Sequence, residues 1–583
     1  MLKVDDSFSR FFAWKWHLFV FLPGLFLLIS LLYYTFCFSP CSYAEVYQGG
    51  ASWLSDYCGF ASLGQGIAFF VLIILLIAFA IALLVVLKKA GRLNGRKWAV
   101  FFAFLLATSS LSLTFALKAN ADFGHIDWCL WNSYADGSGN SSAGHWGVIL
   151  DLFRHGTLAD FPKDSNGSYL FNNQYYQNKL WHYLMAFFMR FNGLFIHLGD
   201  AITADAAANG FAFTETENAL METIRIPVSF FGVWTAIALV RLLEKLGAHD
   251  NIEAIAMGLF AFTPIFTMLP SELNNDSLSF LLTILALYWT LEWHQHFSWH
   301  AIILIAFDLG LAMAAKFNAG VMALPIAGVF LYELIRLYQK KEAGFVGVFK
   351  EHPYRNFWLQ IASFALIVFP LGLFFTVVQN KLYGIPYFYV WYYGVEARNY
   401  VSPEVYNPFI RYFLYPAPDM FFSVFPKFFR SGSTYPYSDP WGGQDFNIWT
   451  GFFKSALFNS GDLDSYPSAK TPLLMTGAIT LYVLAFLLSI FGIVYGVFYL
   501  IRFFQGKHRG VLGFRFFLLL GIAVTEIISY LYFNYKYPFS CTSNCRYILE
   551  FFFPLYLFWA TGLHRVKDYC SLKTKYHSQK SAK

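Results

Sequence analysis

Long apolar runs, separated by shorter polar segments, recur along nearly the whole chain. A helix needs roughly 20 mostly apolar residues to cross the hydrocarbon layer of a bilayer, and about twelve runs reach or nearly reach that length. They lie near 17–36, 66–88, 98–117, 222–243, 252–270, 277–296, 300–316, 320–337, 357–378, 473–501, 514–532 and 549–565. The pattern predicts an all-α integral membrane protein with about 12 transmembrane helices.

Basic residues gather in short clusters after alternate apolar runs. The clusters are Lys88, Lys89, Arg92, Arg96 and Lys97; Arg241 and Lys245; Arg336, Lys340, Lys341, Lys350 and Arg355; Arg502, Lys507 and Arg509; and the tail from Arg565. Cytoplasmic loops carry an excess of Lys and Arg. Counting spans from a cytoplasmic N-terminus places every cluster inside, so we expect both termini in the cytoplasm. The first run has no small-residue cleavage site, which favours a retained anchor over a removed signal peptide.

Two long segments, 118–221 and 379–472, then fall on the extracytoplasmic face. The first contains a partial helix near 145–156 and an amphipathic helix at 178–198, which we expect at the membrane interface. We therefore divide the chain into five regions: 1–117, an N-terminal three-helix membrane region; 118–378, a membrane core with the first large outer loop; 379–472, an aromatic-rich outer lid; 473–565, the C-terminal transmembrane helices; and 566–583, a basic cytoplasmic tail.

The segment 379–472 is rich in Tyr, Phe, Trp and Pro, which is typical of a lid packed onto the membrane surface.

Composition agrees with a membrane protein. Of 583 residues, 57% are hydrophobic and 13% charged, whereas soluble domains carry about 25% charged residues. The net charge of +6 is small, and its basic residues lie between apolar runs, which argues against a nucleic-acid groove. Among seven cysteines, Cys541–Cys545 and Cys41–Cys58 are candidate disulfides on the outer face, with unpaired thiols as the alternative.

Several polar residues fall at the outer ends of apolar runs. Asn274, Asn275 and Asp276 begin a predicted helix, where they either cap the helix or face a polar cavity. Lys316 ends another predicted helix, either as a snorkelling side chain or as a phosphate ligand. Arg546, followed by Tyr547, is either an interfacial anchor or a guanidinium that forks onto a phosphate or carboxylate.

The first outer loop carries Asp122, His125 and Asp127 directly after a predicted span. A carboxylate near a histidine suits general-base chemistry or metal binding. Each of these residues alone is an ordinary surface residue, and their spacing is not a specific metal signature.

In order, four motifs resemble those of the polyprenyl-phosphate-dependent, GT-C class membrane glycosyltransferases. The motifs are Gly144-His145-Trp146-Gly147-Val148-Ile149 with His155-Gly156-Thr157-Leu158-Ala159-Asp160-Phe161; Tyr175-Tyr176-Gln177-Asn178-Lys179-Leu180-Trp181-His182-Tyr183-Leu184; Leu273-Asn274-Asn275-Asp276-Ser277-Leu278 with Met313-Ala314-Ala315-Lys316; and Thr542-Ser543-Asn544-Cys545-Arg546-Tyr547-Ile548. Protein O-mannosyltransferases and lipid A aminoarabinose transferases are relatives in that class. The closer likeness is to bacterial phospholipid-carrier-dependent glycosyltransferases.

The resemblance implies an inverting transfer of a sugar from a polyprenyl-phosphate donor, held at the lipid bilayer, to an extracytoplasmic acceptor in cell-envelope glycosylation. It implies that the substrate contacts His145, Tyr176, His182, Asn274, Asn275, Asp276, Lys316, Arg546 and Tyr547. Lys316 and Arg546 would offset the phosphate charge. The lid residues Trp441, Asp445, Asn447 and Trp449 could stack on sugar rings, with ordinary packing as the equal alternative. Asp276 is the candidate ligand for a divalent cation, magnesium or manganese, which some members of the class use.

The chain departs from the family pattern at two places. The acidic pair expected before His145 is replaced by Asn140-Ser141-Ser142-Ala143, and the family's Pro-Pro becomes Asn178-Lys179. Asp127 is the best match for the catalytic base, with Asp122 and Asp136 as rivals. The missing pair leaves a degenerate, non-catalytic member as one alternative. A transporter or flippase is the other, and the apolar helix interiors and absent repeats count against it.

Overall fold

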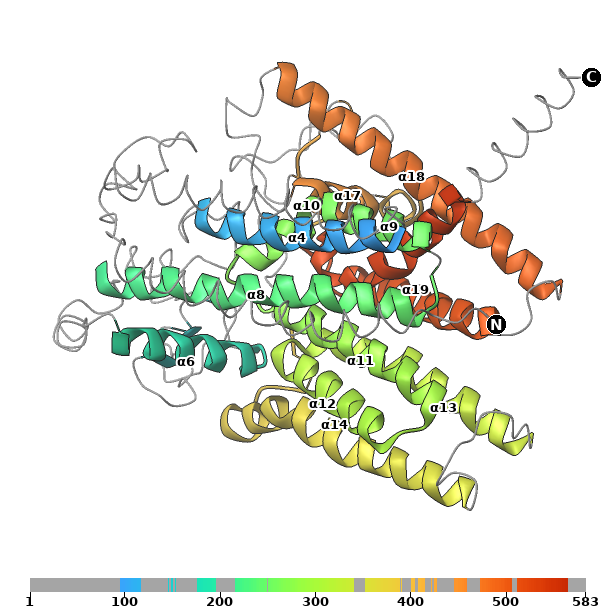
Figure 1. Cartoon of the computed structure of the whole chain (residues 1–583). Coiled ribbons are helices and arrows are strands. Elements are labelled where there is room, and N and C mark those ends of the chain that lie inside the picture. The colour runs from blue at the N-terminus through green and yellow to red at the C-terminus, as the bar shows by residue number, and fades with distance from the viewer. Residues whose placement is uncertain are drawn as a thin grey trace, which may run out of the picture.

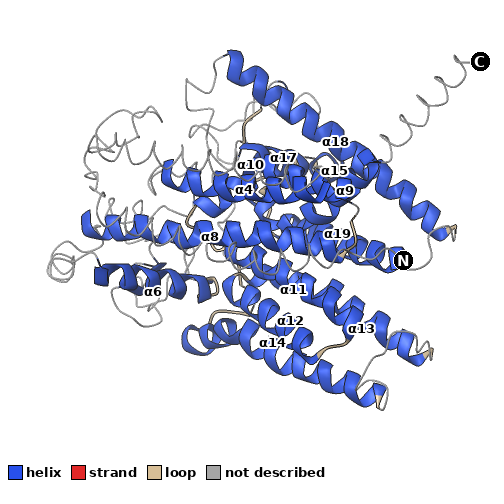
Figure 2. Ribbon diagram, in the orientation of Figure 1, coloured by secondary structure: helices blue, strands red, loops and turns tan. Residues whose placement is uncertain are grey.

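The residues that the computed structural model describes fall between positions 95 and 564. The described residues are 95–116, 145, 148–149, 152–153, 176–195, 215–248, 250–339, 352–387, 389–390, 400–403, 407–414, 421, 424–426, 445–458, 472–505 and 511–564. Across these ranges the regular structure is helical (Figure 2), and the one extended pairing is an isolated bridge between Tyr400 and Phe539. The predicted all-α class is confirmed for this part of the chain.

The helices follow the apolar runs closely. The α-helices are α4 (Gly95–Ala116), α6 (Leu180–Phe195), α8 (Glu215–Lys245), α9 (Asp250–Phe262), α10 (Pro264–Met268), α11 (Asp276–His296), α12 (Trp299–Ala315), α13 (Ala323–Tyr338), α14 (Pro353–Tyr383), α15 (Pro408–Phe413), α17 (Ile448–Phe458), α18 (Pro472–Phe504) and α19 (Val511–Lys536). Short 3₁₀ helices are η3 (Leu269–Ser271), η4 (Phe317–Met322), η8 (Cys541–Ser543), η9 (Cys545–Tyr547) and η10 (Leu549–Phe551), and residues 552–564 are helical.

Five of the described helices are long and apolar enough to cross a membrane, or six if one bent pair is a single span. The five are Ile224–Lys245, Phe317–Tyr338, Pro353–Tyr383, Met475–Phe498 and Phe514–Lys536. The expected runs at 17–36 and 66–88 lie outside the described residues. The runs expected to span at 98–117, 277–296 and 300–316 form helices α4, α11 and α12, which are not among the five. The predicted total of about twelve spans is not confirmed, whereas an integral membrane protein is supported.

The bent pair replaces the single helix expected at 252–270. Asn251–Phe262 and Pro264–Ser271 meet at an angle of 70°. Pro264 begins the second part, and Thr263 before it has an extended backbone with φ −91° and ψ 113°. Proline cannot donate an amide hydrogen bond and disfavours helical geometry in the preceding residue, which explains the break. The Arg225 guanidinium of α8 donates to the Ser271 carbonyl and ties down the far end of the break.

The core is a bundle in which α8 contacts α4 and α11, and α12 contacts α11 and α14 (Figure 1). Two glycines allow α12 and α14 to approach closely. A Cβ atom added at Gly310 would lie 2.9 Å from the Leu371 Cβ, and one at Gly372 would lie 2.9 Å from the Met313 sulfur. Small residues permit this kind of close helix packing in membranes.

The described parts of 379–472 pack against the C-terminal turns. Val401 donates its backbone N–H to the Pro538 carbonyl at 2.8 Å, and α17 contacts η8 and η9. Within α17 and its leader, Asp445 accepts from the Lys454 ammonium at 2.6 Å, with both side chains buried. The region boundaries predicted above stay predictions.

Candidate active site

A cavity opens where α11 begins and α12 ends. Its walls come from the leader of α6, the N-terminus of α11, the α12–η4 turn, the ends of α14 and α19, and the turns η8 and η9. It is lined by His145, Tyr176, Gln177, Asn178, Asn275, Asp276, Lys316, Phe317, Asn318, Thr376, Gln379, Ile385, Pro386, Tyr389, Val390, Ser529, Tyr530, Phe533, Tyr537, Phe539, Cys541, Thr542, Arg546 and Tyr547. Residues about 400 positions apart in the sequence, His145 and Tyr547, therefore line one cavity.

Most of the substrate-binding residues predicted from the sequence meet in this cavity. His145, Tyr176, Asn275, Asp276, Lys316, Arg546 and Tyr547 line it. His182 and Asn274 are buried behind the wall and each contacts a lining residue. The candidate bases Asp122 and Asp127 lie outside the described residues. The structure brings the residues together and leaves their roles as predictions.

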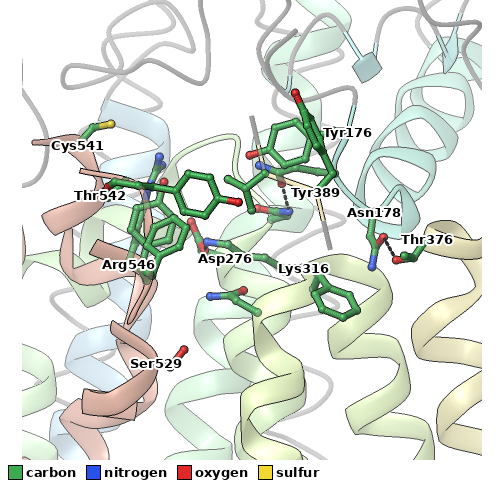
Figure 3. Close-up of a pocket in the computed structure, with 18 of the residues that line it drawn as sticks. Tyr176, Asn178, Asp276, Lys316, Thr376, Tyr389, Ser529, Cys541, Thr542 and Arg546 are labelled. Carbon is green, nitrogen blue, oxygen red and sulfur yellow. Dashed lines mark hydrogen bonds and ion pairs between the residues drawn. The ribbon is translucent and has the colours of Figure 1, made fainter. Parts of the chain in front are cut away.

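Asp276 and Lys316 form an ion pair at the cavity wall (Figure 3). Asp276 is the first residue of α11, and Lys316 directly follows α12, so two helix ends bring the charges together. The side chains are only 3% and 12% exposed. Removing one partner of such a pair leaves a charge that is desolvated and unpaired, which is costly.

Both sequence interpretations of Asn274-Asn275-Asp276 hold, each for a different residue. The Asn274 carboxamide oxygen accepts from the backbone N–H groups of Asp276, at 3.0 Å, and Ser277, at 3.4 Å, which is a capping role. Asn275 points elsewhere and donates to the Gln177 side chain at 2.8 Å and to the Ala315 carbonyl at 2.9 Å. Asp276 faces the cavity.

The cationic side of the cavity is backed by an aromatic ring. The Lys316 ammonium lies 5.0 Å, and the Arg546 guanidinium carbon 5.5 Å, from the centre of the Tyr547 ring. Asn544 caps the turn that carries Arg546, because its side chain accepts from the Arg546 N–H at 3.0 Å. Two cations near one cavity favour an anionic ligand, and a guanidinium suits phosphate oxygens.

Aromatic side chains form much of the remaining wall. Tyr176 and Tyr389 meet edge to face with ring centroids 5.8 Å apart, and Phe533 packs 4.9 Å from Tyr547. Burial, with a smaller effect from Tyr537, raises the pKa of Tyr389, so its phenol stays a neutral hydrogen-bond donor. Apolar rings with polar edges are suited to stacking on sugars.

His145 lines the cavity, and His182 lies behind His145, outside the lining. The His145 Nδ1 and His182 Nε2 atoms are 2.8 Å apart and both side chains are buried. Burial, then the neighbouring His145 and Lys179, lower the pKa of His182 well below its ordinary value. This environment favours the neutral form of the His182 imidazole.

The metal ion expected from the sequence stays a prediction, and for Cys541 and Cys545 the structure has the alternative of unpaired thiols. Among the described residues, no three His, Cys, Asp or Glu side chains gather as metal ligands would, and Asp276 already pairs with Lys316. Cys541 and Cys545 are not bonded to each other. The N–H of Cys545 donates to the Ser455 hydroxyl at 2.8 Å, which ties that turn to α17.

For three of the four lid residues singled out in the sequence, the structure favours packing, the alternative left open above, over sugar binding. The Asn447 side chain caps the start of α17 and donates to the Ile410 carbonyl at 2.6 Å, while the Trp449 indole donates to the Tyr412 carbonyl at 2.9 Å. Asp445 pairs with Lys454. These three residues are outside the cavity lining, and Trp441 lies outside the described residues.

Other lining residues were missed in the sequence. They include Gln177, Asn178, Thr376, Gln379, Tyr389, Phe533 and Tyr537. Two signals pointed to some of them: the replacement of Pro-Pro by Asn178-Lys179, and the polar positions Thr376 and Gln379 near the outer end of an apolar run.

A membrane-embedded helical bundle with a cationic, aromatic cavity at one end of its core is a suitable frame for a lipid-phosphate sugar. Residues 212–349 match the family model of the dolichyl-phosphate-mannose-protein mannosyltransferases. This match covers Asn274, Asn275, Asp276 and Lys316, whereas His145 and Arg546 lie outside it. Neither a curated protein nor a solved structure matches the chain. Together with the apolar helices, the match indicates a membrane glycosyltransferase that uses a lipid-linked sugar.

Proposed function

We propose that this chain transfers a sugar, with inversion, from a polyprenyl-phosphate carrier to an extracytoplasmic glycan, lipid or protein acceptor. One observation carries the proposal: Lys316, within the matched segment, and Arg546, far outside it, converge with Asp276 on one aromatic cavity. A cavity with two cations and one pairing carboxylate is suited to a phosphate and offers the sugar polar groups.

The phosphate is the group that Lys316 and Arg546 hold. As the bond between the anomeric carbon and the phosphate oxygen breaks, negative charge grows on the leaving phosphate. Cations already placed at that oxygen stabilise the transition state more than the ground state. Asp276 keeps the Lys316 ammonium at the wall before the donor arrives.

The acceptor hydroxyl supplies the new bond. Its oxygen attacks the anomeric carbon from the face opposite the phosphate, and its proton passes to a carboxylate, which we assign to Asp127 with Asp122 as the alternative. The leaving phosphate needs no protonation, so a base without a general acid suffices. Tyr176, His145 and Asn275, which line the same wall, are the proposed sugar contacts.

The cavity is proposed to face away from the cytoplasm. α11 begins at Asp276 in the cavity and ends near Glu292, which pairs with Lys245 of the basic cluster at the end of α8. A helix of 21 residues is about 30 Å long, close to the hydrocarbon thickness. Because basic clusters favour the cytoplasmic side, the opposite end of α11 is extracytoplasmic.

Purified protein in nanodiscs, incubated with radiolabelled polyprenyl-phosphate sugars, tests the proposal by consumption of the donor. We expect Lys316→Ala and Arg546→Ala each to lower kcat/KM by roughly 10- to 100-fold, since each removes a charge-assisted contact. Lys381→Ala, an exposed lysine outside the cavity, is the control and should leave turnover unchanged. Donor flux into liposomes with no donor consumed would contradict the enzyme proposal. The use of magnesium or manganese stays a prediction, and donor consumption with and without EDTA tests it.

A further inference from the structure

The last carbonyls of α12 are paired with side chains from the residues that lead into α6 and α11. The last carbonyls of a helix have no partner within it. The Asn178 side chain donates to the Met313 carbonyl at 2.5 Å, and the Asn275 side chain donates to the Ala315 carbonyl at 2.9 Å. Lys316 then turns away with φ −150° and ψ 118°, which ends the helix.

A second hydrogen bond, from helix α14, holds the Asn178 side chain in place. Its carboxamide oxygen accepts from the Thr376 hydroxyl of α14 at 3.2 Å (Figure 3). The neighbouring Gln177 accepts from Asn275 through its side chain and from the Gln379 amide, at 3.0 Å, through its backbone carbonyl. One dipeptide thus joins the start of α11, the end of α12 and the wall of α14.

We propose that Asn178 is a positioning residue for Lys316. By holding the Met313 carbonyl it fixes the last turn of α12, and the residue that follows that turn carries the cavity cation. The inference rests on the proposed function, in which Lys316 holds the donor phosphate.

The hydrogen bond between Asn178 and the Met313 carbonyl is buried. Asn178 is 4% exposed, so water does not readily replace the amide that its loss would remove from the Met313 carbonyl. Leaving the buried Met313 carbonyl unpaired costs more free energy than the hydrogen bond itself contributed. The last turn of α12 therefore relaxes until this carbonyl finds a new partner. The relaxation moves Lys316 relative to Asp276.

The first test compares Asn178→Leu, which keeps the volume and removes the amide, with Ser298→Ala. Ser298 caps the opposite end of α12, where its hydroxyl accepts from the Ala301 N–H at 3.1 Å. We expect Asn178→Leu to lower kcat/KM for the donor roughly tenfold, with most of the loss in kcat, because a displaced Lys316 no longer meets the charge that grows on the leaving phosphate. In the Lys316→Ala background, Asn178→Leu should add nothing, whereas Ser298→Ala should have the same small effect in both backgrounds. An equal loss of kcat/KM with and without Lys316 would overturn the proposal.

A second measurement does not depend on transfer. An amine-reactive reagent is applied to the full chain in nanodiscs, and the modification of Lys316 is followed by peptide mass spectrometry. We expect Asn178→Leu to speed modification of Lys316 and Ser298→Ala to leave it unchanged. If wild type transfers no sugar but the Lys316 rate responds, the proposed function fails and the positioning role stands. An unchanged Lys316 rate contradicts the positioning role.

Asn178→Ser is the variant for the case in which Asn178→Leu does not fold. Its shorter side chain cannot span to the Met313 carbonyl, and it introduces no new bulk. The Lys316 modification rate should rise with this variant too. A rate equal to wild type, in protein whose thermal unfolding is also equal, would show that the amide is not what places Lys316.

Discussion

At the scale of single residues, the cavity combines groups that are each ordinary at a membrane interface. Lys316 and Arg546 resemble snorkelling anchors when taken alone, and Asn274 is an ordinary helix cap. What sets the cavity apart is that these groups converge beside two buried histidines. The His145–His182 contact is the part of it that pH changes most directly.

The pH dependence of stability follows from His182. The pKa of His182 is lowered in the folded state, so the unfolded chain binds more protons once the pH falls below about 6.5. Stability from this group is therefore fully present above that pH and is lost as the pH falls toward the folded-state value. We expect thermal unfolding of wild type to shift downward between pH 7.5 and 5.5.

His182→Gln is the matched variant, because a glutamine keeps polar atoms without titrating in this range. Its unfolding temperature should change less between the two pH values than that of wild type. Lys179 and His145 are the basic groups that face His182, and both remain in the variant. An equal shift in wild type and His182→Gln would assign the pH dependence to other groups.

At the scale of elements, the apolar runs predict most helices within a few residues, because burial in lipid imposes length and composition directly. The 70° break between α9 and α10 was missed, although Pro264 and Pro270 stand inside that run. Helix α17 was missed for the opposite reason. Its side chains are buried against neighbouring turns instead of lipid, so no apolar run of spanning length marks it.

The contact between α12 and α14 yields a stability prediction. Gly310→Ala places a methyl group 2.9 Å from the Leu371 Cβ, and we expect a loss of about 1–3 kcal/mol from overpacking. Gly328→Ala in α13 is the control, since nothing lies within 4 Å of its added Cβ. The control should be neutral or slightly stabilising, because alanine favours helix. Thermal unfolding of both variants in the same detergent checks the pair, and equal unfolding temperatures would contradict close packing at Gly310.

At the scale of the whole molecule, the ion pairs of the basic clusters and the candidate active site lie at opposite ends of the bundle. Arg96 and Arg241 pair with Glu244, and Lys245 pairs with Glu292, all far along α8 and α11 from the cavity. The sequence predicted which residues would share a face, since motif order and basic loops are readable along a chain. It did not predict how Gln177 or Thr376 would contribute, because those contacts depend on three helices meeting in space.

Two cysteines make the orientation of the cavity measurable. Cys541 lines the cavity and is partly exposed, whereas Cys545 is buried, and burial raises its pKa to about 12. The thiolate is the reactive form, so Cys545 should resist alkylation. A membrane-impermeant maleimide added to intact cells should therefore label Cys541 and spare Cys545, as read by peptide mass spectrometry. In nanodiscs, polyprenyl phosphate should slow the labelling of Cys541, because the lipid phosphate fills the space beside it. Labelling of Cys541 only after the cells are permeabilised would place the cavity on the cytoplasmic side and overturn the proposed orientation.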